Sequence, residues 1–134
     1  MKYLFLKFET RGVRNHDIAK VIKINGFAQS AKDKARVEFF APKSSYLDSG
    51  TFLPEVDLSG IDAVVLFGST YTDILSASVM WFSDRGVKVC VVPELIVLLL
   101  NGAAVEEESY YRSIENLLGD GCIADMNSFF SGGN

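Results

Sequence analysis

The chain has 134 residues, of which 49% are hydrophobic and 22% charged, and its formal net charge at pH 7 is −4. This length suits one domain with a real hydrophobic core, so we expect a single α/β domain over residues 1–134. The negative charge disfavours a broad phosphate-binding surface, and no apolar run approaches the ~18 residues that a membrane span needs.

The two cysteines, Cys90 and Cys122, do not have the spacing of metal ligands. Cys90 falls in an apolar run and is expected to be a small buried group. We expect both thiols to be reduced and the protein to be cytoplasmic.

The first third of the chain predicts two strands and a short helix. Residues 3–8 form an apolar first strand, which a polar loop containing His16 follows. Residues 17–24 predict a helix with Ile18, Val21 and Ile22 on one apolar face, and Asn25-Gly26 is a stop signal. The charges within residues 27–36 suggest an exposed segment, and residues 36–41 predict a second strand that Pro42 closes.

Residues 61–92 predict a strand, a polar turn, a helix and a second strand. Residues 63–67 are a bounded apolar run, as expected for a strand covered on both faces. Residues 68–73 read as a turn rich in helix-capping side chains, Gly86 ends the helix, and residues 87–92 form the next buried strand. This βαβ unit matters because such sheets bind ligands where strands end and helices begin.

The last third contains one ambiguous run and one clear helix. Residues 95–100 fit a core helix, a further strand or a subunit-contact face. Residues 106–118 predict an amphipathic helix whose apolar face holds Tyr110, Ile114, Leu117 and Leu118. Residues 122–126 predict an edge strand, and Phe129-Phe130 would dock that strand or a partner.

Together these elements predict a three-layer α/β fold with a mainly parallel sheet and helices on both faces, of the Rossmann-like kind. In such a fold the residues that follow each strand gather at one edge of the sheet. Those with candidate chemistry are Glu9, Arg11, Lys43, Ser45, Ser69, Thr70, Thr72, Asp73 and Glu94.

The 68–73 turn has two interpretations. Its backbone N–H groups and hydroxyls could hold an anion at a helix N-terminus. Alternatively, Thr70 or Thr72 caps the helix and Asp73 offsets the helix dipole. His16, the only histidine, is either a general acid or base or an ordinary surface residue. Lys43 is either a partly buried lysine with a lowered pKa or a surface lysine.

From Lys43 to about Val92 the chain resembles the isochorismatase-like cysteine hydrolases, which are α/β proteins with a parallel sheet. The run that carries this resemblance is Lys43-Ser44-Ser45-Tyr46-Leu47-Asp48-Ser49-Gly50-Thr51, then Gly60-Ile61-Asp62, Gly68, Thr72-Asp73 and Gly86. Lys43 matches the family's lysine, and Glu9 is a possible stand-in for its aspartate. The family's cysteine position falls on Ile74 or Leu75, neither of which can be a nucleophile. The resemblance therefore implies a degenerate, non-hydrolytic relative.

The same βαβ unit also looks somewhat like the NYN and PIN nucleases, which bind Mg²⁺ through several carboxylates. Asp73 matches their pattern, whereas Ser69 stands where an acid is expected. Under this alternative the protein is a metal-dependent ribonuclease, in which Glu9, Asp73 and Glu94 hold Mg²⁺ or Mn²⁺ for the cleavage of a phosphodiester.

We expect binding to be the main activity, with no cofactor and no membrane partner. One form is a small polar or anionic ligand at the strand ends, with charge from Arg11 or Lys43 and contacts from Ser45, Ser69, Thr70 and Thr72. The other form is a homo-oligomer that assembles through residues 95–100 and Phe129-Phe130. If catalysis remains, Lys43, Glu9 and Asp73 would carry it.

Overall fold

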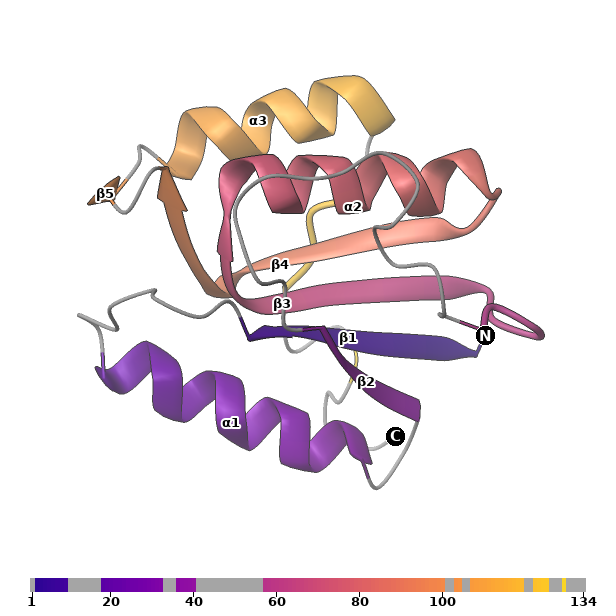
Figure 1. Ribbon diagram of the computed structural model, residues 1–134, viewed down its shortest axis with the longest axis horizontal. Coiled ribbons are helices and arrows are strands. Elements are labelled where there is room, and N and C mark those ends of the chain that lie inside the picture. Colours follow the sequence, from indigo (N-terminus) through magenta and orange to yellow (C-terminus); the bar gives the residue numbers. More distant parts are fainter. Residues whose placement is uncertain are drawn as a thin grey trace.

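The strands that the computed structural model describes form one sheet (Figure 1). The structure describes residues 2–9, 18–32, 36–40, 57–100, 103–104, 107–119, 122–125 and 129. Within these residues the strand order is β2-β1-β3-β4-β5. The strands are β1 (Tyr3–Glu9), β2 (Arg36–Phe40), β3 (Ala63–Tyr71), β4 (Lys88–Leu100) and β5 (Ala103–Ala104). The first four are parallel and β5 runs antiparallel to β4, so the predicted mainly parallel sheet is confirmed.

Helices cover both faces of this sheet (Figure 1). Helix α1 (Ile18–Lys32) lies on one face, while α2 (Thr72–Asp84) and α3 (Glu107–Leu118) lie on the other. This arrangement confirms the predicted three-layer α/β fold. None of the described helices is both long and apolar enough to cross a membrane.

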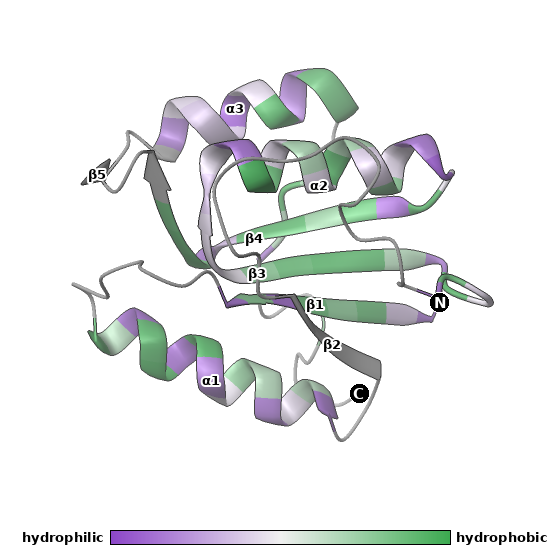
Figure 2. Cartoon of the chain, in the orientation of Figure 1, coloured by the Kyte–Doolittle hydropathy of each residue, from purple (hydrophilic) through white to green (hydrophobic). Residues whose placement is uncertain are grey.

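The core lies along the middle of the sheet. Every residue from Ala63 to Phe67 in β3 is fully buried. In β1 the exposed fractions of Leu4, Phe5 and Leu6 are at most 1%. Figure 2 shows hydrophobic residues along most of β1, β3 and β4 and a mixture on the helices. A central strand that is covered on both faces needs apolar residues at every position, which is why the 63–67 run was recognisable in the sequence.

Helix α1 corrects the predicted helix over residues 17–24. It continues through Asn25 and Gly26 to Lys32. Ile18 and Ile22, expected on the apolar face, are 73% and 66% exposed. The buried face is instead made of Ile24, Phe27, Ala28 and Ala31. Gly26 weakens a helix by roughly 0.5–1 kcal/mol, and burial of Phe27 alone outweighs this cost.

Strand β3 is longer than predicted and replaces most of the expected turn. Gly68, Ser69, Thr70 and Tyr71 pair with residues 96–99 of β4, so the turn over residues 68–73 was wrong. The pairing shifts at this point, because Leu66 pairs with Val91 and Gly68 pairs with Ile96. This irregularity bends both strands near their carboxyl ends (Figure 1).

Gly68 is required at this bend. Its φ is +104°, a backbone conformation that residues with a side chain rarely adopt. A Cβ atom here would lie 2.7 Å from the backbone nitrogen of Phe8 and still closer to the Phe8 carbonyl oxygen. Strands β1 and β3 can therefore approach at their ends only because residue 68 has no side chain.

The ambiguous run over residues 95–100 is part of β4, so the further-strand alternative is confirmed. Leu95, Ile96 and Leu98 are at most 2% exposed within the single chain. These three side chains are therefore core residues and not available for the subunit contact expected of this run.

The C-terminal third follows the prediction in outline. Helix α3 lies where it was expected, but its buried face differs from the predicted one. Leu117, expected on that face, is 63% exposed, whereas Tyr111 is buried. An edge strand was expected over residues 122–126, and within the described residues 122–125 the structure has one parallel bridge between Val91 and Ile123. Phe129 docks within the chain, because its ring packs edge-on against Tyr3 at a centroid distance of 5.3 Å and against Phe5 at 5.8 Å. Phe130 lies outside the described residues.

Candidate functional site

The strand order reverses between β1 and β3, because the chain places β2 on one side of β1 and β3 on the other. Ligands of open α/β sheets commonly bind at such a reversal, beyond the carboxyl ends of the strands. At this edge Glu9 pairs in register with Ser69. The structure thus brings these two predicted site residues side by side on neighbouring strands.

Lys7, on the same strand as Glu9, links Glu9 to α1. The Lys7 ammonium lies 3.2 Å from Glu9 Oε1 and donates a 3.0 Å hydrogen bond to Asn25 Oδ1. Glu9 is exposed, so this ion pair contributes little stability. The pair does, however, place a positive charge beside the predicted catalytic carboxylate.

Thr70 and Asp73, two further predicted site residues, have structural partners for their side chains. Thr70 is fully buried in the strand, and its hydroxyl donates to the carbonyl oxygen of Tyr71. Tyr71 is the N-cap of α2 and makes no capping bond through its side chain. Asp73 Oδ1 accepts a 2.9 Å hydrogen bond from the Ile74 N–H, so Asp73, and neither threonine, satisfies a first-turn donor.

Tyr110 of α3 fixes the start of α2. Its hydroxyl donates a 2.9 Å bond to the Thr72 carbonyl oxygen and lies 2.5 Å from Ser76 Oγ. Burial raises the pKa of Tyr110 to about 12, the hydrogen bond with Ser76 lowers it, and the nearby Asp73 carboxylate raises it further. The phenol is therefore neutral at physiological pH, and the first turn of α2 is held as a rigid part of the fold.

Ile74 and Leu75, the two residues onto which the sequence prediction placed a cysteine position, are both fully buried in α2. No thiol or hydroxyl replaces them, because the next hydroxyl along the helix, that of Ser76, is engaged with Tyr110.

The predicted carboxylates do not form a metal site in the part of the chain that the structure describes. No group of three or more His, Cys, Asp or Glu side chains lies close enough there to hold a metal ion. Glu94 is exposed in the irregular part of β4 between Val91 and Ile96. It does not form a metal-binding group together with Glu9 and Asp73. Arg11, His16, Lys43 and Ser45 lie outside the described residues.

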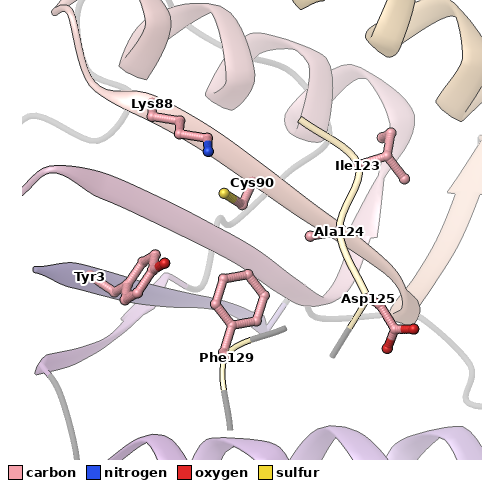
Figure 3. Close-up of a pocket in the computed structure, with 7 residues that line it drawn as sticks. All are labelled: Tyr3, Lys88, Cys90, Ile123, Ala124, Asp125 and Phe129. Atoms are coloured by element: carbon pink, nitrogen blue, oxygen red, sulfur yellow. The ribbon is translucent and has the colours of Figure 1, made fainter. Parts of the chain in front are cut away.

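A pocket lies at the opposite, amino-terminal end of the sheet. It has a volume of about 470 Å³ and is bordered by β1, β4 and the C-terminal segment (Figure 3). Its lining residues are Tyr3, Lys88, Cys90, Ile123, Ala124, Asp125 and Phe129. This volume is within the usual range for small-molecule sites, roughly 300–1,000 Å³.

The pocket follows from the register of three strands. Tyr3 pairs with Ala63, and Ala63 pairs with Lys88, so the three residues form one row across the sheet. Residues in register on neighbouring strands share a face, and Lys88 shares it with Cys90, two positions along β4. The only side chain between Tyr3 and Lys88 in this row is the methyl group of Ala63. Both longer side chains can therefore border one open space.

The charges of the pocket are nearly balanced. Lys88 is exposed, and its amine makes no hydrogen bond or ion pair with any residue that the structure describes. In Figure 3 the amine points toward the Cys90 side of the pocket, while the Asp125 carboxylate lies at the far end. Burial raises the pKa of the Cys90 thiol, and the Lys88 ammonium only partly opposes this effect. Cys90 is thus a neutral thiol, and not an activated nucleophile.

Comparison of the chain with protein-family models, curated proteins and solved structures found no match. The site must therefore be judged from its own residues.

Sequence reasoning missed this pocket. One available signal was Lys88, a charged residue within a run of apolar strand residues, two positions before Cys90. The register that aligns Lys88 with Tyr3 could not be read from the sequence, because the two residues come from strands that only the fold brings into one sheet.

Proposed function

We propose that the protein is a small-molecule binding protein and that the amino-end pocket holds the ligand. The ligand class is a small polar molecule with one anionic group and an apolar, preferably aromatic, body. The proposal is supported by one observation above the others: the Lys88 amine, not engaged with any described residue, borders a cavity of about 470 Å³ beside two aromatic rings.

Each side chain of the pocket would contact a different part of the ligand. The Lys88 ammonium attracts the anionic group, and charge-assisted hydrogen bonds are stronger than neutral ones. Tyr3 and Phe129, which pack edge to face, offer ring surface to an apolar body. Asp125 adds a carboxylate to the lining, which disfavours ligands with several negative charges, such as nucleic acids.

Binding is favoured over catalysis because the described candidate groups are engaged or inert. The Asp73 carboxylate accepts a hydrogen bond from the first turn of α2, Thr70 is buried, and the pKa of Cys90 is raised. The resemblance to a nucleophile-deficient hydrolase agrees with this proposal, since buried aliphatic residues occupy the cysteine position. A cytoplasmic location is part of the proposal, and the absence of a disulfide at Cys90 and Cys122 is compatible with it.

A second hypothesis places ligand binding at the carboxyl ends of β1 and β3, a location that we call the strand-end site. Its supporting observation is the adjacency of Glu9 and Ser69 at the reversal of strand order. Arg11, Lys43 and Ser45, which would complete it, lie outside the described residues.

Self-association is the other candidate. Ile18 and Ile22 lie four residues apart on α1 and are the most exposed large apolar side chains of the described residues. A second copy of this chain would cover them, so any homo-oligomer is expected to form through α1.

A dye titration tests the pocket. The probe is 8-anilino-1-naphthalenesulfonate, an anionic aromatic dye whose fluorescence rises in apolar surroundings. We expect saturable binding to the native protein and a Kd about 3- to 10-fold higher for Lys88→Gln, equivalent to about 1 kcal/mol. Lys23→Gln, the same charge change on the exposed side of α1, is the matched control and should leave the Kd unchanged.

Two outcomes would contradict the proposal. One is that the folded protein shows no saturable binding of the dye. The other is that Lys88→Gln and Lys23→Gln give the same Kd, because the dye then binds elsewhere or without the help of Lys88. Phe129→Ala gives a second check, since loss of one aromatic wall should also weaken binding.

A further inference from the structure

Two cysteines that are distant in the sequence lie beside each other in the fold. Cys90 is in β4 and Cys122 is in the C-terminal segment, and each is only 5% exposed. Neither belongs to the strand-end site, and only Cys90 borders the pocket.

The backbone aligns the two cysteines. Val91 and Ile123 form a parallel bridge, in which the Val91 N–H donates to the Cys122 carbonyl and the Ala124 N–H donates to the Val91 carbonyl. The residues before the bridged pair are Cys90 and Cys122. In a parallel pairing these residues stand opposite each other, with Cα atoms about 4.8 Å apart and side chains on the same face.

This alignment meets the main requirement of a disulfide, which bridges Cα atoms about 4.4–6.8 Å apart. The Cβ atoms of a disulfide are closer together than those of neighbouring strands, so one side must move slightly. The C-terminal segment is attached to β4 by an isolated bridge, and not by a continuous ladder, which allows this adjustment.

We propose that Cys90 and Cys122 form a redox-active pair whose oxidation to a disulfide fastens the C-terminal segment to β4. The bond encloses residues 90–122 in one covalent ring, which contains β5, α3 and all of β4 except its first two residues. It also fixes Ile123, Ala124 and Asp125, which form one wall of the pocket. The proposal concerns the two thiols and does not depend on any ligand in the pocket.

Glutathione disulfide serves as the oxidant. One of the two thiols first loses its proton to solvent. The resulting thiolate then attacks glutathione disulfide, forms a mixed disulfide and releases one glutathione. The second cysteine thiolate then attacks the protein sulfur of that mixed disulfide and releases the second glutathione. The protein loses two protons and two electrons, and the oxidant is reduced to two glutathione molecules.

The test uses the full folded chain, incubated with glutathione disulfide and then denatured in N-ethylmaleimide. We expect a mass loss of about 2 Da and no maleimide adduct, as for one internal disulfide. Trypsin cleaves after Lys88 and Arg112 and not between them. The disulfide should therefore join the peptide of residues 89–112 to the peptide that begins at residue 113.

The oxidised protein should melt about 5 °C higher than the reduced protein, because a disulfide restricts the unfolded chain. Cys90→Ala and Cys122→Ala, each a small change in volume, should abolish both the mass loss and the gain in Tm. Two glutathione adducts, a disulfide-linked dimer, or two maleimide adducts after oxidation would each overturn the proposal. An internal disulfide that lowers the Tm would overturn it too, because the native backbone would then not accommodate the bond.

Discussion

Gly68 offers the most direct test of how β1 and β3 meet. Its φ of +104° and the position of Phe8 beneath it both oppose a side chain, so Gly68→Ala is the perturbation. A left-handed conformation costs an L-residue about 1–2 kcal/mol. The forced shift of the Phe8 backbone adds a further cost, comparable to overpacking a core, of about 1–3 kcal/mol.

Two other glycines separate these contributions. Gly86, at φ +77°, would place a Cβ in open space, so Gly86→Ala should lose only the conformational part, about 1–2 kcal/mol. Gly26 is inside α1, again with open space around a Cβ, so Gly26→Ala should gain about 0.5–1 kcal/mol.

Equilibrium unfolding in urea measures all three variants. The expected loss for Gly68→Ala, about 2–5 kcal/mol, is a large share of the roughly 5–15 kcal/mol that stabilises a typical domain. The reasoning is refuted if Gly68→Ala loses no more stability than Gly86→Ala, because the contact with Phe8 would then carry no cost.

Two further predictions concern the helices. Tyr110→Phe should lose about 1–2 kcal/mol of stability, because Thr72 and Ser76 lose their hydroxyl partner. The folded-state pKa of Tyr110 is raised to about 12, so the stability that its neutral phenol contributes is complete below pH 10 and is lost as pH rises through 12. The native protein should lose about 2 kcal/mol relative to the variant between pH 10 and pH 12, and parallel stability curves would contradict this. If the chain self-associates through α1, light scattering after size exclusion should give a multiple of the monomer mass for the native protein. The double variant Ile18→Ser, Ile22→Ser should be a monomer, because it lacks the apolar contact. Leu117→Ser, which changes a similarly exposed residue on α3, is the control and should keep the native mass. A native protein that is already a monomer would end that hypothesis.

Local sequence patterns predicted the core of the fold well. The 63–67 run, the Gly86 stop and the 106–118 periodicity all correspond to real elements, because burial on two faces and amphipathic packing leave a direct trace in residue type. These signals depend on residues near one another in the chain, and they were sufficient for the three-layer architecture.

The errors arose where tertiary contacts overrode local preference. Ser69 and Thr70 favour turns, yet β4 continues beside them and supplies strand partners. Asn25-Gly26 normally ends a helix, but the burial of Phe27 and Ala31 against the rest of the core continues it. Pro93 lies in the irregular part of β4, where its missing N–H removes no regular ladder bond.

The candidate site was harder to predict than the fold. Strand-end residues could be named from topology alone, and Glu9 and Ser69 are indeed neighbours. The pocket required knowledge of register across three strands and of where the C-terminal segment returns. Neither is encoded by a local pattern, because both depend on pairings between residues far apart in the chain.

The central place of β1 in the sheet also has a consequence for synthesis on the ribosome. Lys2 and Asp62, which are bonded across β1 and β3, are 60 residues apart in the sequence. At about 5–20 residues per second, β1 therefore emerges roughly 3–12 seconds before its inner partner exists. During that interval the apolar edge formed by Leu4, Phe5 and Leu6 is open to other nascent chains, and a chaperone that shields extended apolar segments would raise the yield of this protein.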